Sequence, residues 1–141
     1  YTWLAVGLAA VPANLLWGKL ASHTSERNAL MTALVVQALG VSAPDWLPGL
    51  TGLVISGLLV GGTFTAVVAL SMYCGRQLAP HAASAALGAL TACYGVGQIL
   101  GPVVTARLLE SSGSFAPGLL VAAAALIGAA VLLVPLGKVR F

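Results

Sequence analysis

The stretch from Leu50 to Tyr73 reads LTGLVISGLLVGGTFTAVVALSMY and contains no Asp, Glu, Lys, Arg or His. A lipid hydrocarbon core is roughly 30 Å thick, and a helix rising about 1.5 Å per residue needs about 20 apolar residues to cross it. The stretch meets both conditions. We therefore predict that it crosses a membrane as a single α-helix.

The composition of the whole chain also indicates a lipid environment. Of its 141 residues, 60% are hydrophobic and only 6% are charged, whereas about a quarter of the residues of a soluble domain are charged. So few charges cannot cover a water-soluble particle without leaving large apolar patches exposed. This excludes a conventional soluble globular protein and predicts an all-α protein embedded in the lipid bilayer.

Short polar or Pro-containing segments divide the rest of the chain into further apolar blocks. The second block becomes a full crossing only if it continues through Trp46, which then lies at the membrane interface. Little sequence remains between the blocks, so we expect one transmembrane bundle of five helices. The predicted spans are residues 2–20, 29–47, 50–73, 82–108 and 115–136.

Basic residues orient this predicted bundle, because Lys and Arg concentrate on the cytoplasmic side of membrane proteins. Only Arg107 falls on one side of the bundle, and the other basic residues share the opposite side: Lys19, Arg27, Arg76, Lys138 and Arg140. We therefore expect the N-terminus outside and the C-terminus in the cytoplasm. Because the chain starts outside with Tyr1 and not with Met, we expect it to be the C-terminal fragment of a longer protein.

The sequence disfavours several other classes of protein. The basic residues are scattered between apolar blocks, which argues against nucleic-acid binding. Cys74 and Cys93 lie in neither a CxxC motif nor a Cys/His cluster, so we expect no disulfide or metal framework. No nucleophile with its base and no phosphate-cradling loop is recognisable. We expect no catalytic residue, no metal and no cofactor, and therefore not an enzyme.

Polar and helix-weakening residues inside the first span are candidates for function. Pro12 leaves the carbonyl of Leu8 without its usual amide donor, which predicts a kink. The amide of Asn14 could then bond a freed carbonyl or a neighbouring helix, or it could contact a solute. Bonding to another protein group is the commoner arrangement for such an amide.

The third span carries two kinds of residue with different expected roles. Gly57 and Gly61, four residues apart, permit close approach of another helix. Thr63, Phe64 and Ser71 could instead line an aqueous cavity. The alternative for the two hydroxyls is a hydrogen bond back to their own helix.

The fourth span concentrates residues that weaken a helix. Gly97, Gly101 and Pro102 are tolerated in lipid only where neighbouring helices compensate for them. Tyr94 and Gln98 are four residues apart and share one face of the helix, which makes them a plausible solute-contact pair. A hydrogen-bonded strut between helices is the structural alternative.

Two segments resemble motifs of the major facilitator superfamily. The loop Gly18–Arg27 reads GKLASHTSER and is similar to the family's Gly-x-Leu-x-Asp-Arg-x-Gly-Arg-Arg loop. Gly18, Leu20 and Arg27 match that pattern. Other positions depart from it, and the Asp, the Gly and the penultimate Arg are replaced by Ser22, Ser25 and Glu26.

The fourth span adds a second similarity, because Gly97–Pro102 reads GQILGP and resembles the family's Gly-x-x-x-Gly-Pro element. That element lies in the third helix after the loop, as it does in each half of the family's transporters. Together with Gly61–Phe64 and Tyr94–Pro102, these features make the chain most similar to the YbfB/YjiJ-type branch of the superfamily.

The resemblance implies that these are five helices of the C-terminal six-helix bundle of a twelve-helix transporter. The partners it implies are the missing N-terminal half with one further helix, and an unidentified small solute carried by rocker-switch alternating access. The candidate substrate-binding residues are Asn14, Thr63, Phe64, Ser71, Tyr94 and Gln98. The candidate conformational and packing residues are Gly18, Leu20, Arg27, Gly57, Gly61, Gly97, Gly101 and Pro102.

A bacterial cytoplasmic membrane is the expected location, since the chain is rich in Ala, Leu and Gly. The alternative function is a non-transporting membrane subunit or scaffold. It is favoured by the lack of any Asp, Glu, Lys, Arg or His in the middle third of the predicted spans, because a proton relay usually needs such a group.

Overall fold

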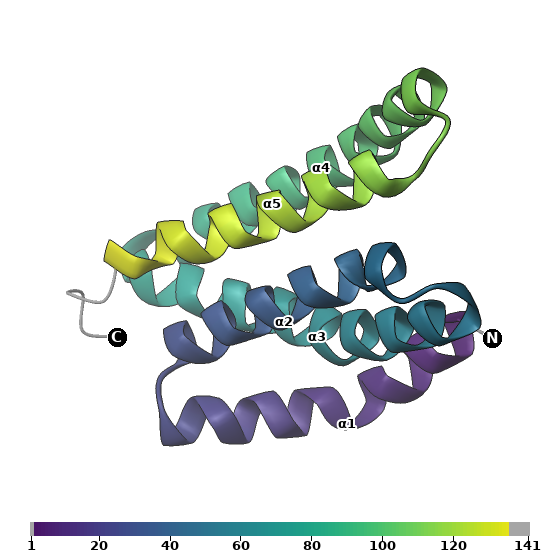
Figure 1. The fold of residues 1–141 in the computed structure, drawn as a ribbon. Coiled ribbons are helices and arrows are strands. Elements are labelled where there is room, and N and C mark those ends of the chain that lie inside the picture. Colours follow the sequence, from purple (N-terminus) through teal and green to yellow (C-terminus); the bar gives the residue numbers. More distant parts are fainter. Residues whose placement is uncertain (1, 136–141) are drawn as a thin grey trace.

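The computed structural model describes residues 2–135, with the side chains of residues 2, 3, 5, 9 and 11 excepted. Within this range the chain is helical and contains no β-strand, as the apolar blocks predict (Figure 1). The helices are α1 (Thr2–His23), α2 (Glu26–Trp46), α3 (Gly49–Leu78), α4 (Ala83–Ser112) and α5 (Ala116–Leu133). A short 3₁₀ turn, η1 (Pro80–Ala82), connects α3 to α4.

Four segments of the described part are long and apolar enough to cross a membrane: α2, α3, η1 with α4, and α5. The helix α1 is not among them. Pro12, Asn14 and Lys19 interrupt its apolar run. An all-α protein with four candidate membrane spans is therefore established, while the fifth span and the complete six-helix bundle stay predictions.

The helix ends follow from local sequence. The Ser25 hydroxyl accepts a hydrogen bond from the Asn28 amide at 3.1 Å and caps α2, so this helix begins three positions before the predicted span. At the other end of the chain, Gly113 ends α4 with a φ of 69°, a conformation that favours glycine. The helices α3 and α4 each have 30 residues and extend past the predicted spans.

Helices α1, α2 and α3 pack together, and the α4–α5 hairpin joins them mainly through α5. Helix α3 packs against both α1 and α2, and α5 packs against α2. Helix α4 contacts α3 and α5 less extensively. The α4–α5 hairpin lies closest to the other helices near the η1 turn and diverges from them toward the α4–α5 loop (Figure 1).

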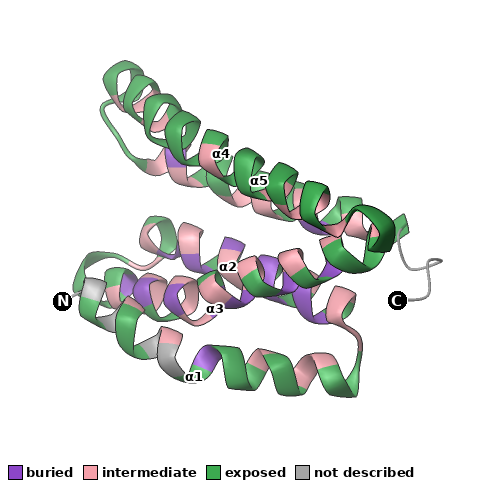
Figure 2. Cartoon of the chain, turned by 180° about the vertical axis from the view of Figure 1, so that it is seen from behind, coloured by how far each residue is buried: buried purple, intermediate pink, exposed green. Residues whose placement is uncertain are grey.

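The buried core lies between α2, α3 and the C-terminal part of α5. Its members are Ala29, Leu30, Leu34, Leu70, Cys74 and Ala130. Helix α4 has no buried residue within the described chain, and most of its residues are exposed (Figure 2). Many large apolar side chains, Leu15, Ile99 and Leu132 among them, are also exposed. Such a surface requires lipid or further protein to cover it.

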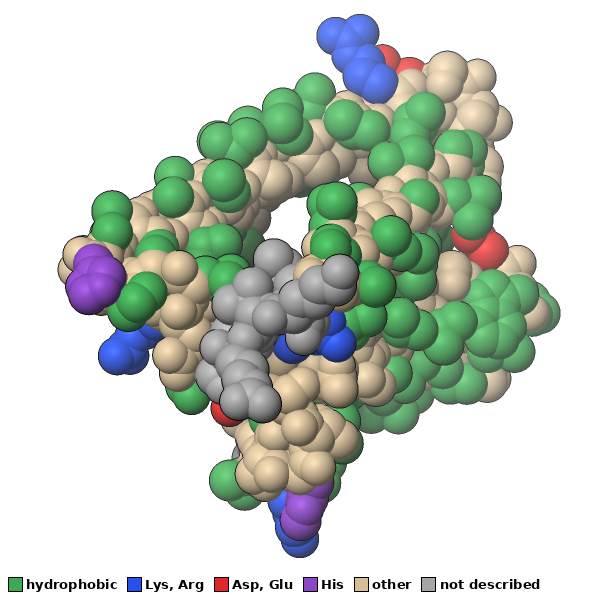
Figure 3. Space-filling model, turned by 90° about the vertical axis from the view of Figure 1, so that its left-hand side faces the viewer, with side chains coloured by type: hydrophobic (Ala, Val, Ile, Leu, Met, Phe, Trp, Pro, Cys, Tyr) green, Lys and Arg blue, Asp and Glu red, His purple; other side chains and the backbone are tan. Residues whose placement is uncertain are grey.

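The α1–α2 and α3–α4 connections lie at the same end of the bundle. Figure 3 looks onto this end, where Lys, Arg and His side chains project from the rim around a central hollow. The α2–α3 and α4–α5 connections lie at the opposite end (Figure 1). Lys19, Arg27 and Arg76 lie toward this end, and Arg107 lies toward the opposite end. Lys138 and Arg140 lie outside the described residues, so the orientation of the bundle stays a prediction.

Candidate solute-binding site

A cavity of about 310 Å³ lies between α2, α3, α4 and α5. Most of its lining is apolar, and a few polar groups converge on it. This combination is typical of small-molecule sites, in which apolar walls supply contact and a few polar groups fix orientation. The residues that line it are Gln37, Phe64, Val67, Val68, Ser71, Met72, Leu90, Tyr94 and Leu126.

Two aromatic rings meet at this cavity from different helices. The ring centroids of Phe64 on α3 and Tyr94 on α4 are 6.5 Å apart, and the rings are inclined by 52°. Tilted aromatic pairs at this separation attract each other through their quadrupoles. The pair therefore joins α3 to α4 where these helices otherwise make few contacts.

The predicted pairing of Tyr94 with Gln98 forms within α4 and not between helices. The Gln98 Nε2 group donates a hydrogen bond of 2.7 Å to the Tyr94 hydroxyl oxygen. Because the phenol oxygen accepts this bond, its own proton remains available to donate. Gln98 therefore orients a donor at the wall of the cavity, although Gln98 itself does not line it.

Gln37 on α2 is a site residue that the sequence reasoning missed. It lines the cavity, and its Oε1 atom is buried without a hydrogen-bond partner among the described residues. A buried acceptor without a partner costs about 1–3 kcal/mol, so a bound ligand or water that donates to Oε1 would be stabilising. The sequence feature that could have identified Gln37 is a single amide side chain near the middle of an apolar span.

Besides Gln98, two of the six candidate substrate-binding residues do not line this cavity. The Thr63 side chain is 1% exposed, and its hydroxyl donates to the carbonyl oxygen of Leu59 at 2.7 Å. This is the own-helix bond that the sequence left as the alternative for Thr63. Asn14 lines a different cavity, between α1 and α3. Phe64, Ser71 and Tyr94 are thus the candidates that share one cavity.

The candidate packing glycines fall into two groups. Gly57 and Gly61 are buried on α3, and a Cβ atom at Gly61 would lie 2.5 Å from the Val6 Cα of α1. By contrast, Gly97 and Gly101 have open space where a Cβ atom would be, and Pro102 beside them is exposed. No other described helix therefore packs closely against Gly97 or Gly101.

The loop residues that carry the superfamily resemblance differ in their contacts. Gly18 is exposed and would admit a Cβ atom freely, whereas Leu20 packs against the core. Arg27 donates through Nη1 to the carbonyl oxygen of Val134 at 2.9 Å. This residue therefore joins the start of α2 to the end of α5, whose last carbonyls lack intrahelical donors.

A bundle of long apolar helices around a cavity with few polar groups defines an integral membrane protein of the multi-helix class. The family model described as "Uncharacterised MFS-type transporter YbfB" matches residues 1–134, and the chain belongs to this family. The resemblance read from the sequence is thereby confirmed. The family indicates a transporter and not an enzyme.

One curated relative is the human protein named Solute carrier family 67 member A1. It is 31% identical over 135 residues, which cover 92% of this chain and 31% of the human protein. The chain thus spans about a third of the length of this relative. No solved structure matches the chain.

The described residues also contain no group of three or more His, Cys, Asp or Glu side chains placed to hold a metal ion.

Proposed function

We propose that this chain forms part of the C-terminal half of a secondary transporter that moves a small solute by rocker-switch alternating access. The observation that carries the proposal is the convergence of Gln37, Ser71 and Tyr94 on one cavity whose remaining lining is apolar. In this class of transporter the solute site lies near the membrane midplane, between repeated helical units that move against each other. Family membership supports the same conclusion.

The lining of the cavity favours an uncharged solute that carries both a hydrogen-bond donor and a hydrogen-bond acceptor. The buried Oε1 atom of Gln37 requires a donor, and the phenol of Tyr94 offers a proton to an acceptor. Within the described part of the chain, no Asp, Glu, Lys, Arg or His lines the cavity. A charge on the solute would therefore be desolvated there without a compensating partner. Any coupling ion would bind in another part of the transporter.

The rest of the transporter would consist of an N-terminal half and one further helix. The human relative is about three times as long as the matched segment, which supports a larger whole. The uncovered face of α4, with Gly97 and Gly101 open to close approach, would contact this missing part. Arg27 and Arg76 lie at one end of the bundle and support a cytoplasmic C-terminus. We propose that the protein lies in a bacterial inner membrane.

The test is uptake of a panel of uncharged solutes by the full-length protein in proteoliposomes. We expect at least one solute to accumulate faster than in protein-free vesicles, and Ser71→Ala to lower its affinity. Thr63→Val is the matched control, because the Thr63 hydroxyl bonds its own helix away from the cavity. If no solute is moved and a partner protein co-purifies stoichiometrically, a subunit or scaffold replaces the transporter.

A further inference from the structure

A second cavity, of about 360 Å³, lies on the opposite side of α3 from the candidate solute site. It is bounded by α1, the first turn of α2 and α3, and it shares no lining residue with the first cavity. Small residues on the facing helices, Gly18 and Ala21 on α1 and Ala66 and Ala69 on α3, leave the space open.

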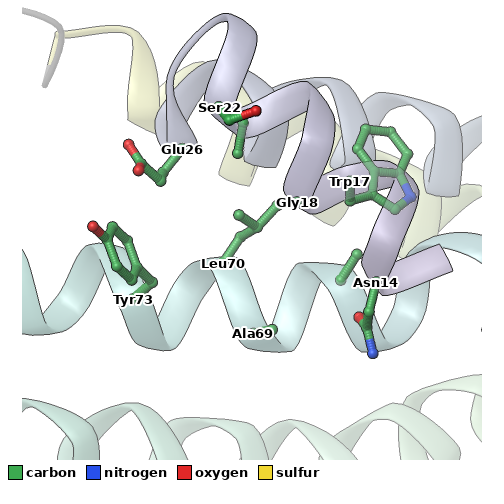
Figure 4. A pocket seen from close by; sticks show the side chains of 10 residues that line it. Asn14, Trp17, Gly18, Ser22, Glu26, Ala69, Leu70 and Tyr73 are labelled. Atoms are coloured by element: carbon green, nitrogen blue, oxygen red, sulfur yellow. The ribbon is translucent and has the colours of Figure 1, made fainter.

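The polar groups of this cavity are arranged along its length. Figure 4 shows the Glu26 carboxylate and the Tyr73 ring at the same end, on opposite walls, with the Asn14 amide at the other end. The Leu70 side chain lies between these ends. The cavity therefore has one anionic, aromatic end, an apolar middle and one neutral polar end.

The local structure holds these groups in place. The Tyr73 hydroxyl accepts a hydrogen bond of 3.0 Å from Gln77 Nε2. The Trp17 indole, which also lines the cavity, donates a bond of 2.7 Å to the carbonyl oxygen of Gly62. Both aromatic side chains are therefore tethered at their polar atoms, while their carbon faces stay available for contact.

The electrostatics of the Glu26 end select the sign of a ligand. Glu26 is half-buried and lies in the first turn of α2, where an acidic side chain complements the helix dipole. Among the described residues, no other charged side chain lines the cavity. A cation placed beside Glu26 gains Coulomb attraction in a partly desolvated setting, and the face of Tyr73 adds cation–π attraction. An anion placed there would be repelled.

We propose that this cavity binds an organic ammonium ion with a compact apolar body. The ammonium group lies between Glu26 and the Tyr73 ring, and the body contacts Leu70 and the small residues of α1 and α3. Asn14 accepts or donates a hydrogen bond to a polar substituent at the far end. This site goes beyond the proposed transport function, because its ligand is charged and its residues lie outside the first cavity.

The test is equilibrium binding of radiolabelled benzyltrimethylammonium to the purified full-length protein in lipid nanodiscs. Unlabelled neopentylbenzene, the neutral carbon isostere, is the competitor that isolates the effect of charge. We expect saturable binding, competition by unlabelled benzyltrimethylammonium and none by neopentylbenzene. Glu26→Gln should weaken binding about tenfold or more, since a charge-assisted contact is lost.

The matched control is Glu110→Gln, which makes the same chemical change at an exposed site near the end of α4. It should leave binding unchanged. Ala69→Leu provides a second variant, because it fills the cavity while Glu26 stays in place, and it should also abolish binding. Thermal unfolding of each variant reports whether the fold is kept.

Three results would overturn the assignment. They are absence of saturable binding, equal competition by the neutral isostere, and a Glu26→Gln or Ala69→Leu variant that is folded and binds like the wild type. Binding is read without transport, so a failed uptake assay leaves this test intact. Conversely, loss of the ammonium site leaves the proposed solute cavity untouched.

Discussion

The Arg27 guanidinium and the Val134 carbonyl oxygen are 2.9 Å apart, although the two residues are separated by 107 positions in the chain. Arg27 also reaches the carbonyl oxygen of Leu133 at 3.5 Å. A cation beside the last carbonyls of a helix satisfies unpaired acceptors and complements the helix dipole. The start of α2 and the end of α5 are thus linked at the end of the bundle where the α1–α2 connection lies.

We expect Arg27→Ala to destabilise the protein by about 1 kcal/mol, a value set by an exposed contact with a helix C-terminus. The measurement is thermal unfolding of the purified full-length protein in detergent. Arg76→Ala is the control, because Arg76 is exposed at the same end of the bundle. An equal loss of stability in both variants would show that the contact between Arg27 and α5 contributes nothing specific.

Tyr94 and Gln98 should act as one unit in solute binding. Tyr94→Phe removes the donor, and Gln98→Ala removes the group that orients it. We expect each change to weaken solute affinity several-fold and the double variant to be no weaker than Tyr94→Phe alone. A double-mutant cycle on transport KM measures this coupling. Additive losses would mean that the two side chains contact the solute independently.

Gly61 should tolerate no side chain. A Cβ atom at this position would overlap the backbone of Val6, so Gly61→Ala must push α1 away from α3. Overpacking of this kind costs about 1–3 kcal/mol. Gly88→Ala is the control, because nothing lies within 4 Å of its added Cβ atom. Thermal unfolding of the two variants should differ, and equal melting temperatures would contradict the close approach of α1 to α3.

Pro102→Ala is expected to slow turnover more than it changes affinity. Proline in a membrane helix frees a carbonyl and weakens the helix at that point, which favours bending during conformational exchange. Pro102 lies inside the continuous helix α4 and is exposed in the described chain. Steady-state uptake kinetics separate the two effects. A variant with unchanged kcat would remove Pro102 from the conformational step.

The helical architecture and the pairing of neighbouring residues could be predicted from sequence because both follow from periodicity. The apolar run Leu50–Tyr73 within α3 contains no charged residue, which is sufficient to identify a membrane helix. Likewise, the four-residue spacing of Tyr94 and Gln98 fixes their shared face before any tertiary contact forms. The observed 2.7 Å hydrogen bond is a local consequence of that spacing.

The composition of the cavity could not be predicted in the same way, because it depends on which helices pack together. Thr63 and Phe64 are adjacent in the chain, yet Thr63 is buried against its own helix and Phe64 lines the cavity. Gln37 lines the same cavity only because α2 packs beside both α3 and α5. Such contacts between distant segments leave no local pattern in the sequence.

The most direct test of the central claim is the initial rate of solute uptake by Gln37→Leu, normalised to the amount of protein in the membrane. The substitution removes the buried acceptor that has no partner within the described chain and replaces it with an apolar side chain of similar size. The account predicts unchanged or higher thermal stability and a rate at least about tenfold lower, as loss of a buried hydrogen bond implies. Uptake equal to that of the wild type would contradict the assignment of this cavity as the solute site.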